Sequence, residues 1–154
     1  MAKKRPERIG LAIVGAGRVG LFRGEVAARH PQVDFIGVAD VKPDRAKLVA
    51  DKVGADFVTA DYRELLARLE VTAAIIATDE HLHVGPVLAA VERKLSLLIE
   101  KPLATELSES ERVLKAIQKS GVDAVVGYTQ RFRRRALQAG IRGHIRSGPA
   151  FIMA

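Results

Sequence analysis

The chain has 154 residues, of which 48% are hydrophobic and 28% charged, and it contains no cysteine. These proportions are typical of one globular domain with a hydrophobic core, and the lack of cysteine excludes disulfides and thiolate metal sites. The charged start of the chain is unlike a signal peptide, and no stretch is apolar for long enough to cross a bilayer. We therefore expect a cytoplasmic protein.

The net charge of +7 is concentrated near the end of the chain. No acidic residue follows Asp123, and without the six arginines that do follow it the chain carries 19 basic and 18 acidic residues. No aromatic ladder or recognition motif accompanies these arginines, so we expect a solvated or domain-facing helix and no nucleic-acid partner. The six are Arg131, Arg133, Arg134, Arg135, Arg142 and Arg146.

Apolar segments alternate with segments of helical periodicity along the chain. This alternation predicts an α/β fold with a doubly wound, mainly parallel sheet, and ligands beyond the carboxyl ends of its strands. Strands are predicted at 9–14, 35–39, 56–59, 72–77, 95–99 and 122–127. Helices are predicted at 18–30, 43–52, 61–69, 83–94 and 105–120.

Two local patterns refine these helices. The spacing of Val19, Phe22, Val26 and Ala27 predicts that they form the core-facing side of the first helix. The segment 61–64 has the sequence of a capping box, in which the side chains at its two ends bond to each other's backbone.

The segment Gly15-Ala16-Gly17-Arg18-Val19-Gly20 has the spacing G-x-G-x-x-G between the first strand and the first helix. Here Gly15 permits a tight turn, Gly17 lets the backbone approach a pyrophosphate, and Gly20 lets the helix pack close to the sheet. The free N–H groups and positive dipole at the helix start attract phosphates. The segment therefore predicts a dinucleotide site.

Asp40 ends the second strand, 20 residues after Gly20. An acidic side chain at this distance can accept hydrogen bonds from the hydroxyls of the adenosine ribose. Because its charge would repel a 2′-phosphate, Asp40 predicts NAD as the preferred cofactor. Lys42 and Arg45 lie close enough to weaken that preference, so NADP stays an alternative.

Three later segments complete a pattern. They are Ala77-Thr78-Asp79-Glu80-His81-Leu82-His83, Glu100-Lys101-Pro102 and Gly127-Tyr128-Thr129-Gln130-Arg131-Phe132. Together with the glycine segment and Asp40, in this order, they resemble the amino-terminal domain of the Gfo/Idh/MocA oxidoreductases. The resemblance covers nearly the whole chain. It departs from the family at Asp79 and Glu80, which stand where the family has Pro and Asn and bring negative charge to this loop.

The resemblance implies hydride transfer between a nicotinamide and a carbon that bears a hydroxyl or carbonyl, on a sugar, polyol or related small molecule. It makes Lys101 the acid–base residue, because an amine beside the nicotinamide can relay or stabilise the proton of that hydroxyl. It implies that Glu100 orients Lys101. A structural role for Glu100, as a helix-capping residue, is the alternative. The sharp turn after the strand also predicts a cis bond between Lys101 and Pro102. The cofactor contacts it implies come from Gly15, Ala16, Gly17, Arg18, Val19, Gly20, Asp40, Thr78, His83, Glu100 and Lys101.

The resemblance also implies a second α/β domain that supplies most of the substrate pocket. We expect residues 1–130 to form the dinucleotide-binding domain and residues 131–154 to form a connecting helix and the start of that missing domain. The chain alone should then bind dinucleotide without turnover. The apolar run 151–153 predicts that the chain alone self-associates by strand addition. Separately, we expect a homo-oligomer.

Three other interpretations remain. The chain could be a non-catalytic dinucleotide-binding module or sensor. A different Rossmann protein, such as a methyltransferase, is disfavoured by Lys101-Pro102 and Arg131-Phe132 together. His81 and His83 suggest a metal pair, but no third ligand lies nearby in sequence, so we expect helix-start residues that line the cleft and no metal.

Overall fold

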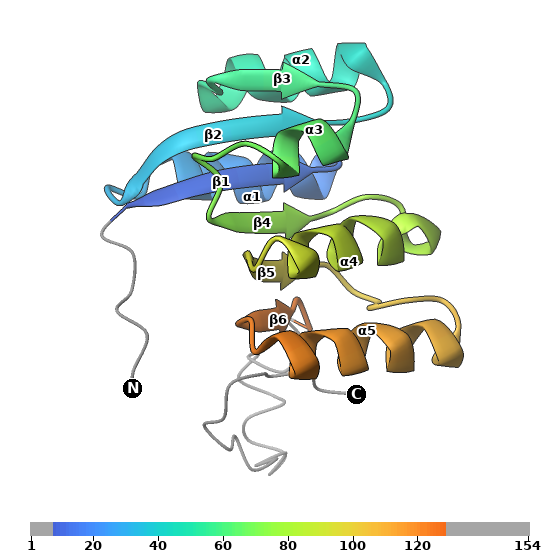
Figure 1. Cartoon of the computed structure of the whole chain (residues 1–154). Helices are drawn as coiled ribbons and strands as arrows, with labels where there is room; N and C mark the ends of the chain where they lie inside the picture. The colour runs from blue at the N-terminus through green and yellow to red at the C-terminus, as the bar shows by residue number, and fades with distance from the viewer. Residues whose placement is uncertain (1–7, 129–154) are drawn as a thin grey trace, which may run out of the picture.

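The computed structural model describes residues 8–128, and these contain one six-stranded sheet whose paired strands all run parallel. The strand order is β3-β2-β1-β4-β5-β6, so the chain winds outward from β1 in both directions (Figure 1). This is the doubly wound arrangement, and the predicted fold class is confirmed. The strands are β1 Ile9–Val14, β2 Val33–Ala39, β3 Phe57–Thr59, β4 Ala73–Ile76, β5 Ser96–Ile99 and β6 Ala124–Val126.

Helices cover both faces of the sheet (Figure 1). The first two pack against each other on one face, and α3, α4 and α5 cover the other. This division follows from the topology, because right-handed crossovers place helices on opposite faces once the winding direction reverses. The helices are α1 Arg18–Ala28, α2 Pro43–Val53, α3 Tyr62–Leu66, the short 3₁₀ helix η1 Glu80–Leu82, α4 Val84–Glu92 and α5 Leu107–Ser120.

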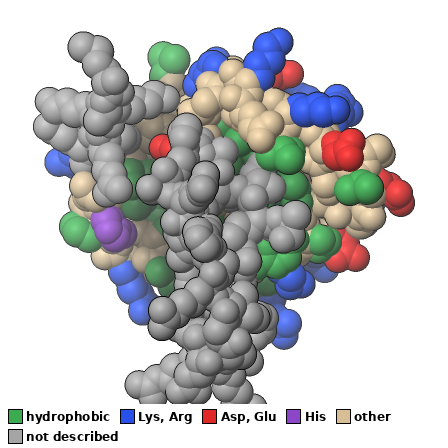
Figure 2. Space-filling model, turned by 90° about the horizontal axis from the view of Figure 1, so that it is seen from below, with side chains coloured by type: hydrophobic (Ala, Val, Ile, Leu, Met, Phe, Trp, Pro, Cys, Tyr) green, Lys and Arg blue, Asp and Glu red, His purple; other side chains and the backbone are tan. Residues whose placement is uncertain are grey.

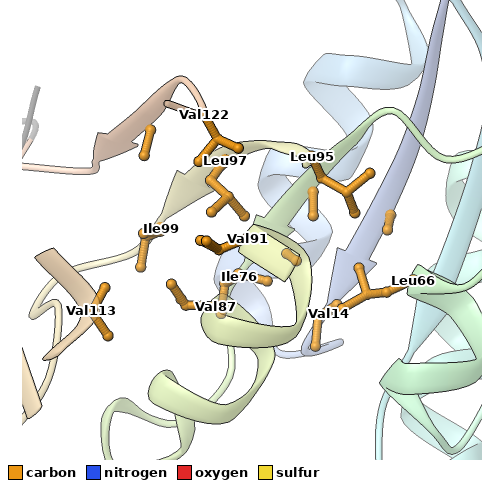
Figure 3. Packing of buried hydrophobic residues seen from close by; sticks show 14 of the residues in the cluster. Val14, Leu66, Ile76, Val87, Val91, Leu95, Leu97, Ile99, Val113 and Val122 are labelled. Atoms are coloured by element: carbon orange, nitrogen blue, oxygen red, sulfur yellow. The ribbon is translucent and has the colours of Figure 1, made fainter. Parts of the chain in front are cut away.

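A larger and a smaller hydrophobic cluster fill the two layers. The larger lies between the sheet and α3, α4 and α5, where Ile76 and Ile99 of the central strands are fully buried against Val87 and Val113 (Figure 3). The smaller lies under α1 and α2 and includes Ile13. The central strands are therefore apolar on both faces, as parallel strands covered by helices must be.

The core-facing side of α1 differs from the prediction. Val19 is 42% exposed, and Phe22 and Val26 are each 57% exposed, whereas Gly20 and Gly24 are the buried residues of this helix. A Cβ atom built on Gly24 would lie 2.8 Å from Ile13 Cδ1. The helix approaches the sheet so closely at Gly20 and Gly24 that a side chain there would collide. Val19, Phe22 and Val26 therefore face outward, whereas Ala27 is partly buried against the smaller cluster, as predicted.

Several element ends also differ. Helix α1 ends at Ala28 instead of residue 30, and α3 ends at Leu66 instead of residue 69. The predicted capping box does not form, because the Asp61 side chain accepts from the Arg63 N–H at 2.8 Å and the Glu64 carboxylate accepts from Thr59 Oγ1. The short helix is therefore capped at one backbone group only.

The face of the molecule at the β6 edge carries hydrophobic side chains among Lys, Arg, Asp and Glu, with both signs of charge mixed (Figure 2). Within residues 8–128, no helix has the length and apolar content that a membrane crossing requires. The predicted helix at 131–148 and its arginines, like the apolar run 151–153, lie outside the described residues.

Candidate dinucleotide-binding site

The parallel register brings the ends of five strands into one row. Val14 is paired with Ala39 on one side and with Ile76 on the other, and the row continues through Ile99 to Val126. The residues that directly follow are therefore neighbours at one edge of the sheet, although they span most of the chain. We call this set the carboxyl edge; its members are Gly15, Asp40, Ala77, Glu100 and Gly127.

The glycine loop at the carboxyl edge has the geometry that its sequence predicts. Gly15 has a φ of +99°, and a Cβ atom there would collide with the backbone of Ala77. A Cβ on Gly20 would collide with the backbone oxygen of Gly15. By contrast, a Cβ on Gly17 would meet nothing within 4 Å. Gly17 thus faces open space at the start of α1, where a ligand could approach the backbone and the helix N–H groups.

Asp40 connects the end of β2 to this loop. Its Oδ2 accepts a hydrogen bond from the Ala16 N–H at 2.7 Å, and its Oδ1 accepts one from the Lys42 N–H at 2.8 Å. Each oxygen of an ionised carboxylate has a second acceptor position, so ribose hydroxyls could still bind. Asp40 shares a pocket with Gly15, Gly17, Thr78 and Asp79, between the glycine loop and the segment after β4.

His83 is buried, with 1% of its surface exposed. Its Nδ1 lies 2.7 Å from the Pro102 carbonyl oxygen and its Nε2 lies 3.1 Å from the Thr78 carbonyl oxygen. A neutral imidazole can donate to one of these acceptors and an imidazolium to both. The ring therefore joins the loop after β4 to the loop after β5, and both of its nitrogens are engaged inside the protein. His81 is exposed, and no group of three potential metal-binding side chains occurs within residues 8–128.

Replacing His83 by Leu should lower the free energy of unfolding by about 2–3 kcal/mol, because the buried ring would no longer contact the Pro102 and Thr78 carbonyls, at least one of which accepts a hydrogen bond from it. Urea denaturation of the purified chain measures this change. The matched control is His81→Leu on the exposed face of η1, which should stay within about 0.5 kcal/mol of the wild type. Equal losses in the two variants would show that His83 does not hold the two loops together.

Lys101 follows directly after the carboxyl edge and its side chain is exposed. The Lys101–Pro102 bond is cis, which confirms the prediction for this turn. The next residue, Leu103, is buried in the larger cluster, so the turn is anchored while the lysine remains accessible.

Glu100 is held by a residue that the sequence analysis did not select. The Arg23 guanidinium donates a hydrogen bond from Nε to Glu100 Oε1 at 2.7 Å, and its Nη2 forms an ion pair with the same oxygen at 2.7 Å; the side chains are 24% and 12% exposed. Arg23 lies three residues after Gly20, one turn further along α1. A basic residue on the first turns of this helix was the available signal, but nothing in the sequence indicated its partner 77 residues away.

Comparisons with known proteins agree with this geometry. Residues 9–128 match the Gfo/Idh/MocA oxidoreductase family with an NAD-binding Rossmann fold. The chain belongs to this family. The match ends at the last residue that the structure describes and includes the glycine loop, Asp40 and the Lys101 turn.

Bacterial relatives give the scale of the similarity. The Gfo/Idh/MocA domain is 32% identical over 126 residues to the oxidoreductase YrbE of Bacillus subtilis, covering 82% of this chain and 37% of that protein. It is 35% identical over 153 residues to an inositol 2-dehydrogenase of Acidothermus cellulolyticus, covering 96% of this chain and 43% of that protein. The chain thus spans about two fifths of the length of these relatives.

Solved structures share the fold. An NAD-binding oxidoreductase from Klebsiella pneumoniae superposes with a TM-score of 0.74 at 26% identity, over 86% of this chain and 37% of that one. The scyllo-inositol dehydrogenase of Lactobacillus casei, solved with NAD(H) and scyllo-inositol, gives a TM-score of 0.77 at 19% identity, over 86% and 39%. The second likeness concerns the fold alone.

Proposed function

We propose that this chain is the NAD-binding domain of an oxidoreductase that transfers a hydride between nicotinamide and a hydroxyl- or carbonyl-bearing carbon. The observation that carries this proposal is the carboxyl edge, where the glycine loop, Asp40 and the Lys101 turn meet although they are far apart in sequence. The open space at Gly17 fits a pyrophosphate, since any side chain there would fill it.

In this proposal each part of the carboxyl edge has one task. The start of α1 binds the pyrophosphate, Asp40 accepts from the adenosine ribose, and Thr78 lies in the pocket on the other side of β1. A bound nicotinamide supplies the hydride acceptor or donor. Lys101 holds or moves the proton of the substrate hydroxyl at its Nζ, and His83 keeps the Thr78 and Lys101 loops together.

NAD should bind more tightly than NADP, because the Asp40 carboxylate repels a 2′-phosphate. Titration of the purified chain with NADH and NADPH tests this, and we expect at least about tenfold tighter binding of NADH, the effect of one unfavourable charge contact. Asp40→Ala should weaken NADH more than NADPH. Asp51→Ala, at an exposed position near the other end of α2, is the control. Tighter binding of NADPH by the wild type would contradict the assignment.

The substrate class is a sugar, a polyol or a related small molecule, and this part of the proposal is supported by relatives named as inositol dehydrogenases. Asp79 lines the pocket and Glu80 begins η1, so the substrate and cofactor meet more negative charge here than in the family pattern.

We also propose a cytoplasmic homo-oligomer in which residues 131–154 lead into a second, substrate-binding domain. If the chain binds NADH but the longer protein shows no turnover, the chain is instead a non-catalytic dinucleotide-binding module.

A further inference from the structure

The ion pair between Arg23 and Glu100 is unusual among those that the structure describes. The other two, Arg8–Asp34 and Arg68–Glu70, have side chains that are 34–74% exposed, whereas those of Arg23 and Glu100 are 24% and 12% exposed. Two nitrogens of Arg23 converge on one carboxylate oxygen: Nε donates a hydrogen bond to Glu100 Oε1, and Nη2 lies 2.7 Å from the same atom. Charge-assisted bonds of this kind fix the direction of a carboxylate more firmly than a single contact does.

A second segment, the end of β6, also lies against the Glu100 carboxylate. A Cβ atom built on Gly127, directly after β6, would lie 3.1 Å from Glu100 Oε2 and 3.3 Å from Oε1. The Gly127 N–H also donates to the Ile99 carbonyl, which extends the strand pairing to this point. Glu100 is thus enclosed by α1 on one side and by the end of β6 on the other, and its direction is set by these two segments.

The peptide bond after Glu100 leads directly to Lys101. A change in the direction of Glu100 therefore changes the start of the Lys101 turn, whose other end is held by His83 through the Pro102 carbonyl. An unpaired carboxylate at this position would also be free to attract the neighbouring ammonium group. By binding Glu100, Arg23 removes this competitor and keeps Lys101 available.

Glu100 and Asp40 lie at the same edge of the sheet but on opposite sides of β1. In the strand order, β2 and Asp40 are on one side of β1, and β4, β5 and Glu100 are on the other. A dinucleotide that crosses the carboxyl edge with its adenosine at β2 extends its nicotinamide half toward β4 and β5. A dinucleotide bound in this way would place its nicotinamide half, and not its adenosine half, beside the Arg23–Glu100 pair.

We propose that Arg23 is a positioning residue for the nicotinamide end of the site, acting through Glu100 on the Lys101 turn. This inference rests on the proposed function, since it assumes a nicotinamide dinucleotide at the carboxyl edge. It assigns to α1 two tasks: its first residues bind the pyrophosphate, and Arg23, one turn later, sets the loop that faces the nicotinamide.

The test compares NADH with ADP-ribose, which lacks the nicotinamide, as ligands of the purified chain. Arg23→Met should weaken NADH about tenfold, the effect of losing one charge-assisted contact, and change ADP-ribose by less than about twofold. Arg23→Lys should recover part of the loss, because it restores the charge without the two-pronged contact. Glu100→Gln should resemble Arg23→Met. The control is Arg8→Met, which breaks an exposed pair at the amino end of β1 and should change neither ligand.

The outcomes separate the two proposals. If Arg23→Met weakens NADH and ADP-ribose equally, the pair supports the domain as a whole and the positioning role is wrong. If neither ligand changes in Arg23→Met and Glu100→Gln, the positioning role is also wrong while the proposed function stands. A wild-type chain that binds neither ligand contradicts the proposed function and this inference with it.

Discussion

Replacing Gly20 by Ala should lower the free energy of unfolding by about 4 kcal/mol or more, a loss large enough to unfold many single domains. The added Cβ would collide with the Gly15 backbone oxygen, and neither side of this contact is a flexible side chain. Relief requires either the turn at Gly15 or the whole of α1 to move away from β1. At an ordinary helix position the same change would add about 1 kcal/mol of stability. A loss of stability would therefore show that α1 packs closely against the Gly15 turn. Urea and thermal denaturation measure it.

Gly17→Ala is the matched control in the same loop. Its Cβ would meet no protein atom within 4 Å, so we expect a stability change of about 1 kcal/mol or less. NADH binding should nevertheless fall at least about tenfold, because the methyl group occupies the space proposed for the pyrophosphate. If Gly20→Ala is as stable as Gly17→Ala, α1 does not pack as closely as the structure indicates.

Lys101→Met should lower the turnover rate about 10³-fold, the usual range for loss of a positioned acid–base group. This measurement requires the longer protein to which the domain is proposed to belong, since the chain alone should bind dinucleotide without turnover. The affinity for NADH should change much less than the rate, because methionine keeps most of the volume of the side chain. Steady-state rates and NADH titration of the same variant separate the two effects.

The control for this variant is Lys52→Met, at the last turn of α2 and away from the carboxyl edge. It should keep the full rate. Full activity of Lys101→Met would exclude the proton-transfer role, and the family resemblance would then apply to cofactor binding alone. Turnover by the 154-residue chain itself would mean that all catalytic groups precede Ala154, and Asp79, Glu80 and His81 would be the first to test.

The sequence by itself determined the order of strands and helices, the glycine loop and the position of Asp40. These features depend on local chemistry. The loop needs glycines at Gly15 and Gly20 wherever it occurs, and alternating apolar strands and helices leave few topologies open. Once the sheet is parallel, residues that end neighbouring strands must meet at one edge, so Asp40 and Glu100 could be placed at the same site before any coordinates were known.

Only the tertiary structure decided which face of α1 is buried. Helical periodicity shows that Val19, Phe22 and Val26 lie close together on the helix, but it does not show how close the sheet will be. The tight turn at Gly15 brings the helix so near to β1 that the face with Gly20 and Gly24 is buried, while the side chains of Val19, Phe22 and Val26 remain outside.

Two polar contacts could not be predicted either, because no motif in the sequence indicates them. His83 bonds to Pro102, 19 residues later in the chain, and Arg23 bonds to Glu100, 77 residues later. Periodicity and motif spacing describe neighbours along the chain, whereas these partners become neighbours only when β4, β5 and α1 are assembled. A side chain's partner across such a distance is determined by the packing of the whole sheet, and the sequence of either segment alone does not contain it.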